Sequence, residues 1–299
     1  MLKAYTWRMK YRETLTPDSF YVSLKGLEQW AETTDKPMDR AVLNSLIAGI
    51  YADYASSNRW QIRQRTNIVD EAPSSDIREW SSNMFVQQVM KYTAGSLQDT
   101  GLLLNTSSRI YIPFVKLGDT SEYYHHDMLH LLGSRGVDAL NNVMGLDKDS
   151  VVQTSVENVY LGMLDAYEKA GMDDGYVLCK LDYLNWKRNS DPTFVPYRAP
   201  QNLIGLTQDP YLAGLDKLKA DFKSHDVCAE VYLAKARYAV EKQQQVMALQ
   251  ICDEAIRLYP DYKRINALKN LKQEILNPAL YVRADQVVYP DTDMKLMVN

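Results

Sequence analysis

Three side chains between residues 122 and 130 have the types and the spacing that suit metal binding. Glu122, His126 and His130 recur every fourth residue, so on a continuous helix they share one face, where two imidazoles one turn apart can bind a divalent cation. The glutamate that follows the first histidine in zinc peptidases is missing here, and no third ligand lies close beyond the segment. Histidines near the start of a helix also commonly cap it or pack against it. We therefore expect no functional metal and keep these residues as weak candidates.

The sequence offers little support for nucleophilic catalysis or for cofactor binding. No Gly-x-Ser-x-Gly elbow is present, and none of Cys179, Cys228 and Cys252 adjoins a histidine or forms a Cys-x-x-Cys pair. The glycines of Gly133-Ser134-Arg135-Gly136 fall in a helical pattern without the phosphate-binding lysine. We predict no catalytic residue and no cofactor; a metal-dependent enzyme using residues 122, 126 and 130 is a distant alternative.

The elements that would position any site are predicted to be helices. The 299 residues are 46% hydrophobic and 24% charged, and only 13 glycines and 11 prolines interrupt them, which favours long helices with short connections. The net charge of −4 provides no field to attract nucleic acid. No apolar run approaches the roughly 18 residues of a membrane helix, so no membrane span is expected in this chain.

Apolar residues recur at helical spacing in most of the chain. Helices are predicted at 19–33, 39–55, 77–91, 122–143, 155–170 and 175–188, and then in a run over 210–276. Between about 102 and 118, β-branched and aromatic residues around Pro113 predict an irregular, extended excursion. The proline-rich stretch at 191–200 predicts a loop. We expect a layer of helical hairpins over 1–190 and a second helical section over 191–278.

Residues 229–262 resemble one tetratricopeptide repeat. The positions that carry the resemblance are Tyr232, Ala236, Ala248, Ala255 and Pro260. Two helices can nest closely only where small residues lie at their crossing, and a proline ends the second helix before the next repeat. An ordinary helical hairpin is the alternative explanation. The predicted fold class is accordingly all-α, a tetratricopeptide-like helical-hairpin solenoid.

Aromatic usage and the last residues carry two further signals. The chain has 21 tyrosines and 5 phenylalanines. Tyrosine can bury its ring while its hydroxyl reaches a polar partner, which suits both grooves between helices and interfaces with other proteins. Of these two roles, we favour packing between helices.

Residues 287–289 and 294–298 predict two β segments around Pro290-Asp291. Because an isolated hairpin is marginal in water, we expect 279–299 to belong to a larger β domain.

Several segments resemble the amino-terminal helical region of large alpha-2-macroglobulin-like proteins of Bacteroides and its relatives. They are residues 3–13, 51–54, 77–80 and 123–128. The resemblance covers nearly the whole chain and implies that a leader precedes this region, that β-sandwich macroglobulin domains follow it, and that residues 279–299 begin the first of these. Such proteins are thought to entrap peptidases, some through a Cys-Gly-Glu-Gln thioester. The cysteines here precede Lys180, Ala229 and Asp253 instead, so this chain lacks the thioester.

These observations together predict a non-catalytic scaffold or protein-binding module at the front of a large secreted peptidase-trapping protein. Its expected partners are the downstream β domains of the same polypeptide, and a second protein or a peptidase. The resemblance implies a periplasmic or cell-envelope location. A free-standing tetratricopeptide-type adaptor for a peptide or protein is the alternative.

Overall fold

The computed structural model describes residues 4–5, 7–9, 11, 20–65, 76–111, 127–191, 194, 209–277, 282–284 and 296–298. Within them the fold is all-α except for two strands of three residues each. The contacts divide the chain into two compact units, Met1–Gly214 and Leu215–Asn299. This division falls inside helix α10 (Pro210–Asp221), beyond the proline-rich stretch where the sequence analysis places it; residues 192–193 and 195–208 lie outside the described residues.

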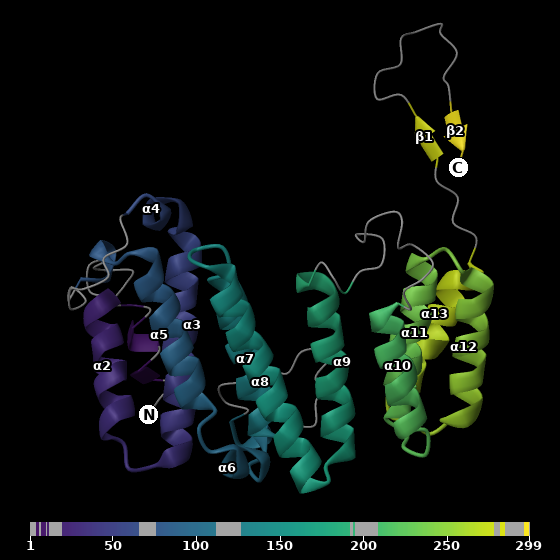
Figure 1. The fold of residues 1–299 in the computed structure, drawn as a ribbon, viewed down its shortest axis with the longest axis horizontal. Coiled ribbons are helices and arrows are strands. Elements are labelled where there is room, and N and C mark those ends of the chain that lie inside the picture. Colours follow the sequence, from purple (N-terminus) through teal and green to yellow (C-terminus); the bar gives the residue numbers. More distant parts are fainter. Residues whose placement is uncertain are drawn as a thin grey trace, which may run out of the picture. The chain divides into compact units, whose positions relative to one another are not determined.

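The first unit is a series of helices packed side by side (Figure 1). Its long helices are α2 (Phe20–Thr33), α3 (Pro37–Ser57), α5 (Ser82–Ser96), α7 (Met128–Asn142), α8 (Asp149–Ala170) and α9 (Asp173–Ser190). Helix α3 contacts α2, α5 and α7, while α7 contacts α5 and α8, and α8 contacts α9. The shorter elements are α4 (Arg59–Arg63), η2 (Ile77–Glu79), α6 (Thr100–Leu104) and η3 (Ser108–Tyr111).

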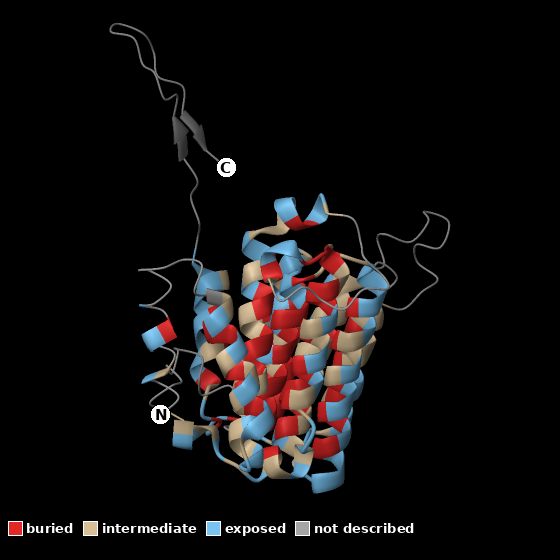
Figure 2. Cartoon of the chain, turned by 90° about the vertical axis from the view of Figure 1, so that its left-hand side faces the viewer, coloured by how far each residue is buried: buried red, intermediate tan, exposed pale blue. Residues whose placement is uncertain are grey.

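Apolar residues on the facing sides of these helices form one core. In α3, Leu43, Ile47 and Tyr51 are almost inaccessible, and the buried alanines Ala48 and Ala52 allow neighbouring helices to approach closely. Figure 2 shows buried residues in bands along the helices, with exposed residues on the outer sides. Burying one such large apolar side chain contributes about 1.5–3 kcal/mol, so mutual coverage of these bands drives the helices together.

The predicted extended excursion near 102–118 is wrong for the part that the structure describes. Residues 100–104 form helix α6, because the Asp99 carboxylate accepts a hydrogen bond from the Leu102 N–H at 2.9 Å and caps the helix. Leu103 is fully buried and anchors this short helix to the core. Residues 108–111 form the 3₁₀ helix η3. The rest of the predicted excursion, residues 112–118, lies outside the described residues.

Two predicted helices begin later than the periodicity indicates. The helix predicted from Ile77 is interrupted: a 3₁₀ turn, capped by the Asp76 carboxylate, ends at Glu79, and α5 begins at Ser82. The helix predicted from Glu122 cannot run continuously to Val143, because Asp127 is extended, with φ −89° and ψ 163°. Helix α7 therefore begins at Met128, with Asp127 as its N-cap.

The second unit contains the rest of α10 and three further helices. These are α11 (Cys228–Glu241), α12 (Gln245–Leu258) and α13 (Ile265–Leu276). Helices α11 and α12 form a hairpin, and α13 packs against both. The hairpin turn includes Gln243 with φ 60°, a left-handed conformation that a non-glycine residue seldom adopts.

Two short strands follow the helices of the second unit. Strands β1 (Val282–Ala284) and β2 (Leu296–Val298) pair antiparallel, with Val282 opposite Val298. Strand β2 coincides with the end of the second predicted β segment, whereas the first, residues 287–289, lies outside the described residues.

None of the described helices combines the length and the apolar composition that crossing a membrane requires.

Candidate functional site

His130, the one described member of the three weak metal-ligand candidates, is buried in the first turn of α7. Its side chain is 1% exposed, and its Nε2 lies 3.4 Å from the Asp182 carboxylate of α9. Glu122 and His126 lie outside the described residues. Because Asp127 is extended, the continuous helix that would place all three residues on one face is not present. Among the described residues, no group of three or more His, Cys, Asp or Glu side chains is arranged to hold a metal ion.

A buried polar network connects α7 with α8. The Asp127 carboxylate accepts the backbone N–H of His130 at 2.6 Å and the hydroxyl of Tyr167 at 2.8 Å. Burial, together with the negative charge of Asp127, raises the pKa of Tyr167 far above its usual value. The Tyr167 hydroxyl therefore remains a hydrogen-bond donor at physiological pH, a state that suits a structural connection between helices.

The three cysteines are buried in helices. Burial is the main cause of a raised pKa at each thiol, and it raises the pKa of Cys252 to about 11. The reactive form of cysteine is the thiolate, so these side chains are predominantly neutral thiols. Their burial fits a packing role within the helices.

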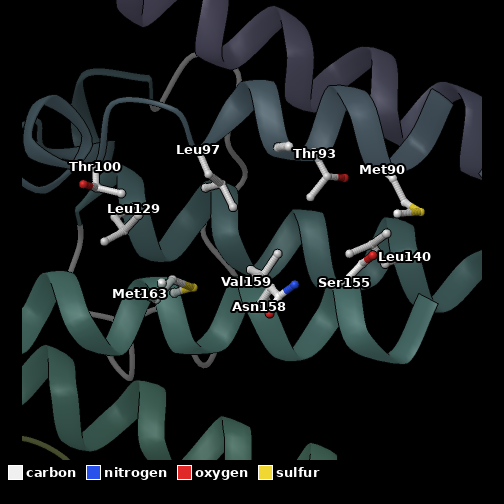
Figure 3. Close-up of a pocket in the computed structure, with 12 residues that line it drawn as sticks. Met90, Thr93, Leu97, Thr100, Leu129, Leu140, Ser155, Asn158, Val159 and Met163 are labelled. Carbon is white, nitrogen blue, oxygen red and sulfur yellow. The ribbon is translucent and has the colours of Figure 1, made fainter. Parts of the chain in front are cut away.

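A cavity of about 320 Å³ lies among α5, α7 and α8. Figure 3 shows Met90 and Thr93 extending from α5, and Leu97 from just after it, toward α7, which carries Leu129 and Leu140. Helix α8 closes the other side with the residues Ser155, Asn158, Val159, Gly162 and Met163. The lining is mainly apolar, with a few hydroxyl and amide groups.

Two glycines of α7 determine how closely α5 and α8 approach α7 beside this cavity. A Cβ at Gly136 would lie 2.7 Å from the Thr93 methyl group of α5, and a Cβ at Gly133 would clash with the Met163 sulfur of α8. Each glycine therefore accommodates a side chain of a neighbouring helix, which fixes α5 and α8 against α7. The cavity is the space that remains between α5 and α8 next to these two contacts.

The predicted repeat positions lie in the α11–α12 hairpin and just after it. Tyr232, Ala236, Ala248 and Ala255 are fully buried, and Pro260 follows α12, which ends at Leu258. The Tyr232 hydroxyl donates to the Glu254 carboxylate of α12 at 2.8 Å. The α11–α12 contact thus includes a tyrosine–carboxylate hydrogen bond, and both helices carry fully buried alanines at the predicted positions.

The residues around the cavity cannot be identified from the sequence. The two glycines fit an ordinary helical pattern, and the two methionines and the leucines are indistinguishable from core residues in a single sequence. One local signal was present: Ser155, Asn158 and Gly162 form a stripe of small or polar residues along α8. That stripe indicates an uncovered face, but not which helices face it.

No family model, curated protein or solved structure matches this chain.

Proposed function

We propose that this chain is a non-catalytic helical scaffold within a large secreted alpha-2-macroglobulin-like peptidase-trapping protein. The observation that carries the proposal is a set of tyrosine–carboxylate hydrogen bonds that connect neighbouring helices. In the first unit, Glu28 of α2 accepts the hydroxyls of both Tyr51 of α3 and Tyr92 of α5, each at 2.7 Å. The Tyr167–Asp127 contact connects α8 to the start of α7.

Similar contacts continue in α8, α9 and the second unit. Tyr183 of α9 donates to Glu157 of α8 at 2.7 Å, and Tyr232 connects α11 to α12. Tyrosine has two side-chain torsions, so immobilising it costs little conformational entropy, and each such bond fixes the position of one helix on another. Helical layers fastened in this way suit a module that spaces or presents other domains.

The place of the module in a larger protein comes from the family resemblance. Under this proposal residues 279–299 begin a macroglobulin-type β-sandwich, the downstream β domains are the main partners, and the protein works in the periplasm or cell envelope. The β1–β2 pairing supports this assignment, because a two-stranded hairpin is marginal without further strands.

A tetratricopeptide-type adaptor is the second candidate, and a specific observation favours it. Fully buried alanines lie on both helices of the α11–α12 hairpin, and α13 packs against both helices, as the next helix of a helical-repeat stack would. In this case the module would bind a peptide or protein without the macroglobulin domains.

The test compares the longer gene product with a variant that lacks residues 1–278. A scaffold role predicts that the deletion reduces the amount of an added peptidase that stays bound on native gels, while residues 1–278 alone retain none. Equal retention by both forms would exclude the scaffold role. Specific capture of one periplasmic protein by residues 1–278 alone would favour the adaptor. Stoichiometric transition metal in the metal-replete chain would instead support the metal-dependent alternative.

A further inference from the structure

We propose that the cavity among α5, α7 and α8 binds a small, uncharged, mainly apolar molecule that carries one hydrogen-bonding group. This inference goes beyond the scaffold role and does not depend on it. The volume of about 320 Å³ is at the lower end of the range for small-molecule sites, about 300–1,000 Å³. The occupant should therefore be about the size of one or two fused rings.

The apolar part of the ligand follows from the side chains that surround the cavity. Leu97, Leu129 and Leu140 supply fixed hydrocarbon surface, whereas Met90 and Met163 can adjust their shape, because methionine is unbranched and flexible. None of the twelve described residues that line the cavity is ionisable. A charged ligand group would lose its hydration without gaining a counter-charge, so the lining selects against ions.

The polar part of the ligand follows from Thr93. This residue is 2% exposed, and its hydroxyl has no hydrogen-bond partner among the described residues. A buried hydroxyl without a partner costs free energy, and a ligand with a hydroxyl, carbonyl or N–H group that reached Thr93 through a small movement of this side chain would remove that cost. Figure 3 shows the Thr93 side chain directed from α5 toward the cavity. The amide of Asn158, an exposed residue, offers a second polar contact at the rim.

Gly162 keeps the opening on the α8 side clear. Apart from the adjoining residues and backbone of α8 itself, no atom lies within 4 Å of the place where a Cβ at Gly162 would stand. A Cβ at this position therefore meets open space, and we expect a larger side chain to extend into the opening. This makes Gly162→Leu a blocking variant that should leave the fold intact.

Binding is tested on the intact chain with a neutral fluorescent probe, N-phenyl-1-naphthylamine, which has aromatic rings and a single N–H. We expect a saturable, one-to-one fluorescence increase that weakens at least tenfold in Gly162→Leu. Thr154→Leu is the matched control, since Thr154 is an exposed residue of the same helix and does not line the cavity. Unchanged thermal unfolding of Gly162→Leu would show that the variant is folded.

The chemical class is tested by displacing the probe with naphthalene, 1-naphthol and 1-naphthoate. We expect 1-naphthol to displace it best and 1-naphthoate at least tenfold less effectively. Thr93→Val keeps the shape of the side chain and removes its hydroxyl, so it should abolish the preference for 1-naphthol over naphthalene.

Three results would overturn the proposal. They are the absence of saturable probe binding, equal binding to the folded Gly162→Leu variant, and equal displacement by 1-naphthol and 1-naphthoate. Absence of binding would also be the result if the cavity receives an apolar side chain from a protein partner.

Discussion

Each unit buries a carboxylate at a helix interface, and the two units stabilise it differently. In the first unit Asp127, 4% exposed, accepts a backbone N–H at the start of α7 and the Tyr167 hydroxyl. In the second unit Glu230, 5% exposed, accepts the Tyr262 hydroxyl at 3.0 Å and pairs with the Arg264 guanidinium at 2.7 Å. The first arrangement uses the positive end of a helix dipole, and the second uses a counter-charge.

The difference shows what each arrangement fixes. Asp127 is a short side chain bound to backbone at one place, so it sets where α7 starts and holds Tyr167 at the same time. Glu230 and Arg264 are longer, and the Arg264 side chain keeps 17% of its surface exposed, so water can replace part of the contact. We therefore expect the first unit to be more sensitive to loss of its carboxylate contacts than the second unit.

The largest effect is expected for Asp127→Ala. The substitution removes the N-cap of α7, worth about 1 kcal/mol, and leaves the buried Tyr167 hydroxyl without its acceptor, which costs roughly 1–3 kcal/mol. We expect a total loss of about 3 kcal/mol in the unfolding free energy, measured by urea denaturation. Arg264→Ala in the second unit should cost less, and a loss equal to or greater than that of Asp127→Ala would contradict the comparison.

The next largest effect is expected at the helix crossing of the second unit. Ala248→Leu or Ala255→Leu should destabilise the protein by about 1–3 kcal/mol, because both alanines are fully buried and a larger side chain would overpack the α11–α12 contact. Met247→Leu is the control, since Met247 is exposed on the same helix. Thermal unfolding unchanged in both alanine variants would count against the repeat assignment.

Smaller changes in stability, of opposite sign, are expected when two glycines of the first unit are replaced by alanine. Gly162→Ala should stabilise the protein by about 0.5–1 kcal/mol, because the new methyl group enters open space and alanine is the better helix former. Gly136→Ala should destabilise it, since its Cβ would lie 2.7 Å from the Thr93 methyl group. Differential scanning calorimetry measures both; stabilisation by Gly136→Ala would show that α5 can move away from α7.

The smallest effects are expected from acid titration. The hydrogen bond from Lys187, followed by that from Tyr183, lowers the pKa of Glu157 below 4.5. Stability from Glu157 is thus present above pH 4.5 and disappears as the pH falls through the folded-state pKa. At Glu230, burial raises the pKa above 4.5, opposed mainly by Arg264, so this contribution is greatest below pH 4.5 and declines as the pH rises through the folded-state pKa.

Two isosteric variants separate these contributions. The stability of the wild type relative to Glu157→Gln should increase with pH below about 4.5 and then level off. The stability relative to Glu230→Gln should decrease as the pH rises above about 4.5. Urea unfolding at a series of pH values measures both differences, and slopes of the same sign would contradict the assignment of opposite environments.

Local sequence signals predict much of the helical fold but not its interruptions. Apolar spacing gives the bounds of α2 and α3 within two residues, because one periodic stripe covers each helix. The same spacing misplaced the start of α7, where the capping preference of Asp127 outweighs the periodicity before it. Residues 102–104 were misassigned because a short helix depends on its cap, Asp99, and on the burial of Leu103 more than on propensity.

The sequence predicts that tyrosines form polar contacts between helices, but not which partners they have. The excess of tyrosine indicated hydroxyls that need polar partners, yet that Tyr51 and Tyr92 share Glu28 depends on the packing of three helices. The cavity likewise depends on how far apart α5 and α8 lie on α7. Gly133 and Gly136 set that spacing, and a single sequence does not show which side chains they accommodate.

The distribution of buried thiols gives each unit its own reporter of opening. Cys179 lies in α9 of the first unit, and Cys228 and Cys252 lie in α11 and α12 of the second. A disulfide reagent can reach such a sulfur only after the surrounding helices separate, so its labelling rate measures the free energy of local opening. Mass spectrometry of the labelled peptides would thus measure local opening of the two units separately in one sample of the wild-type protein.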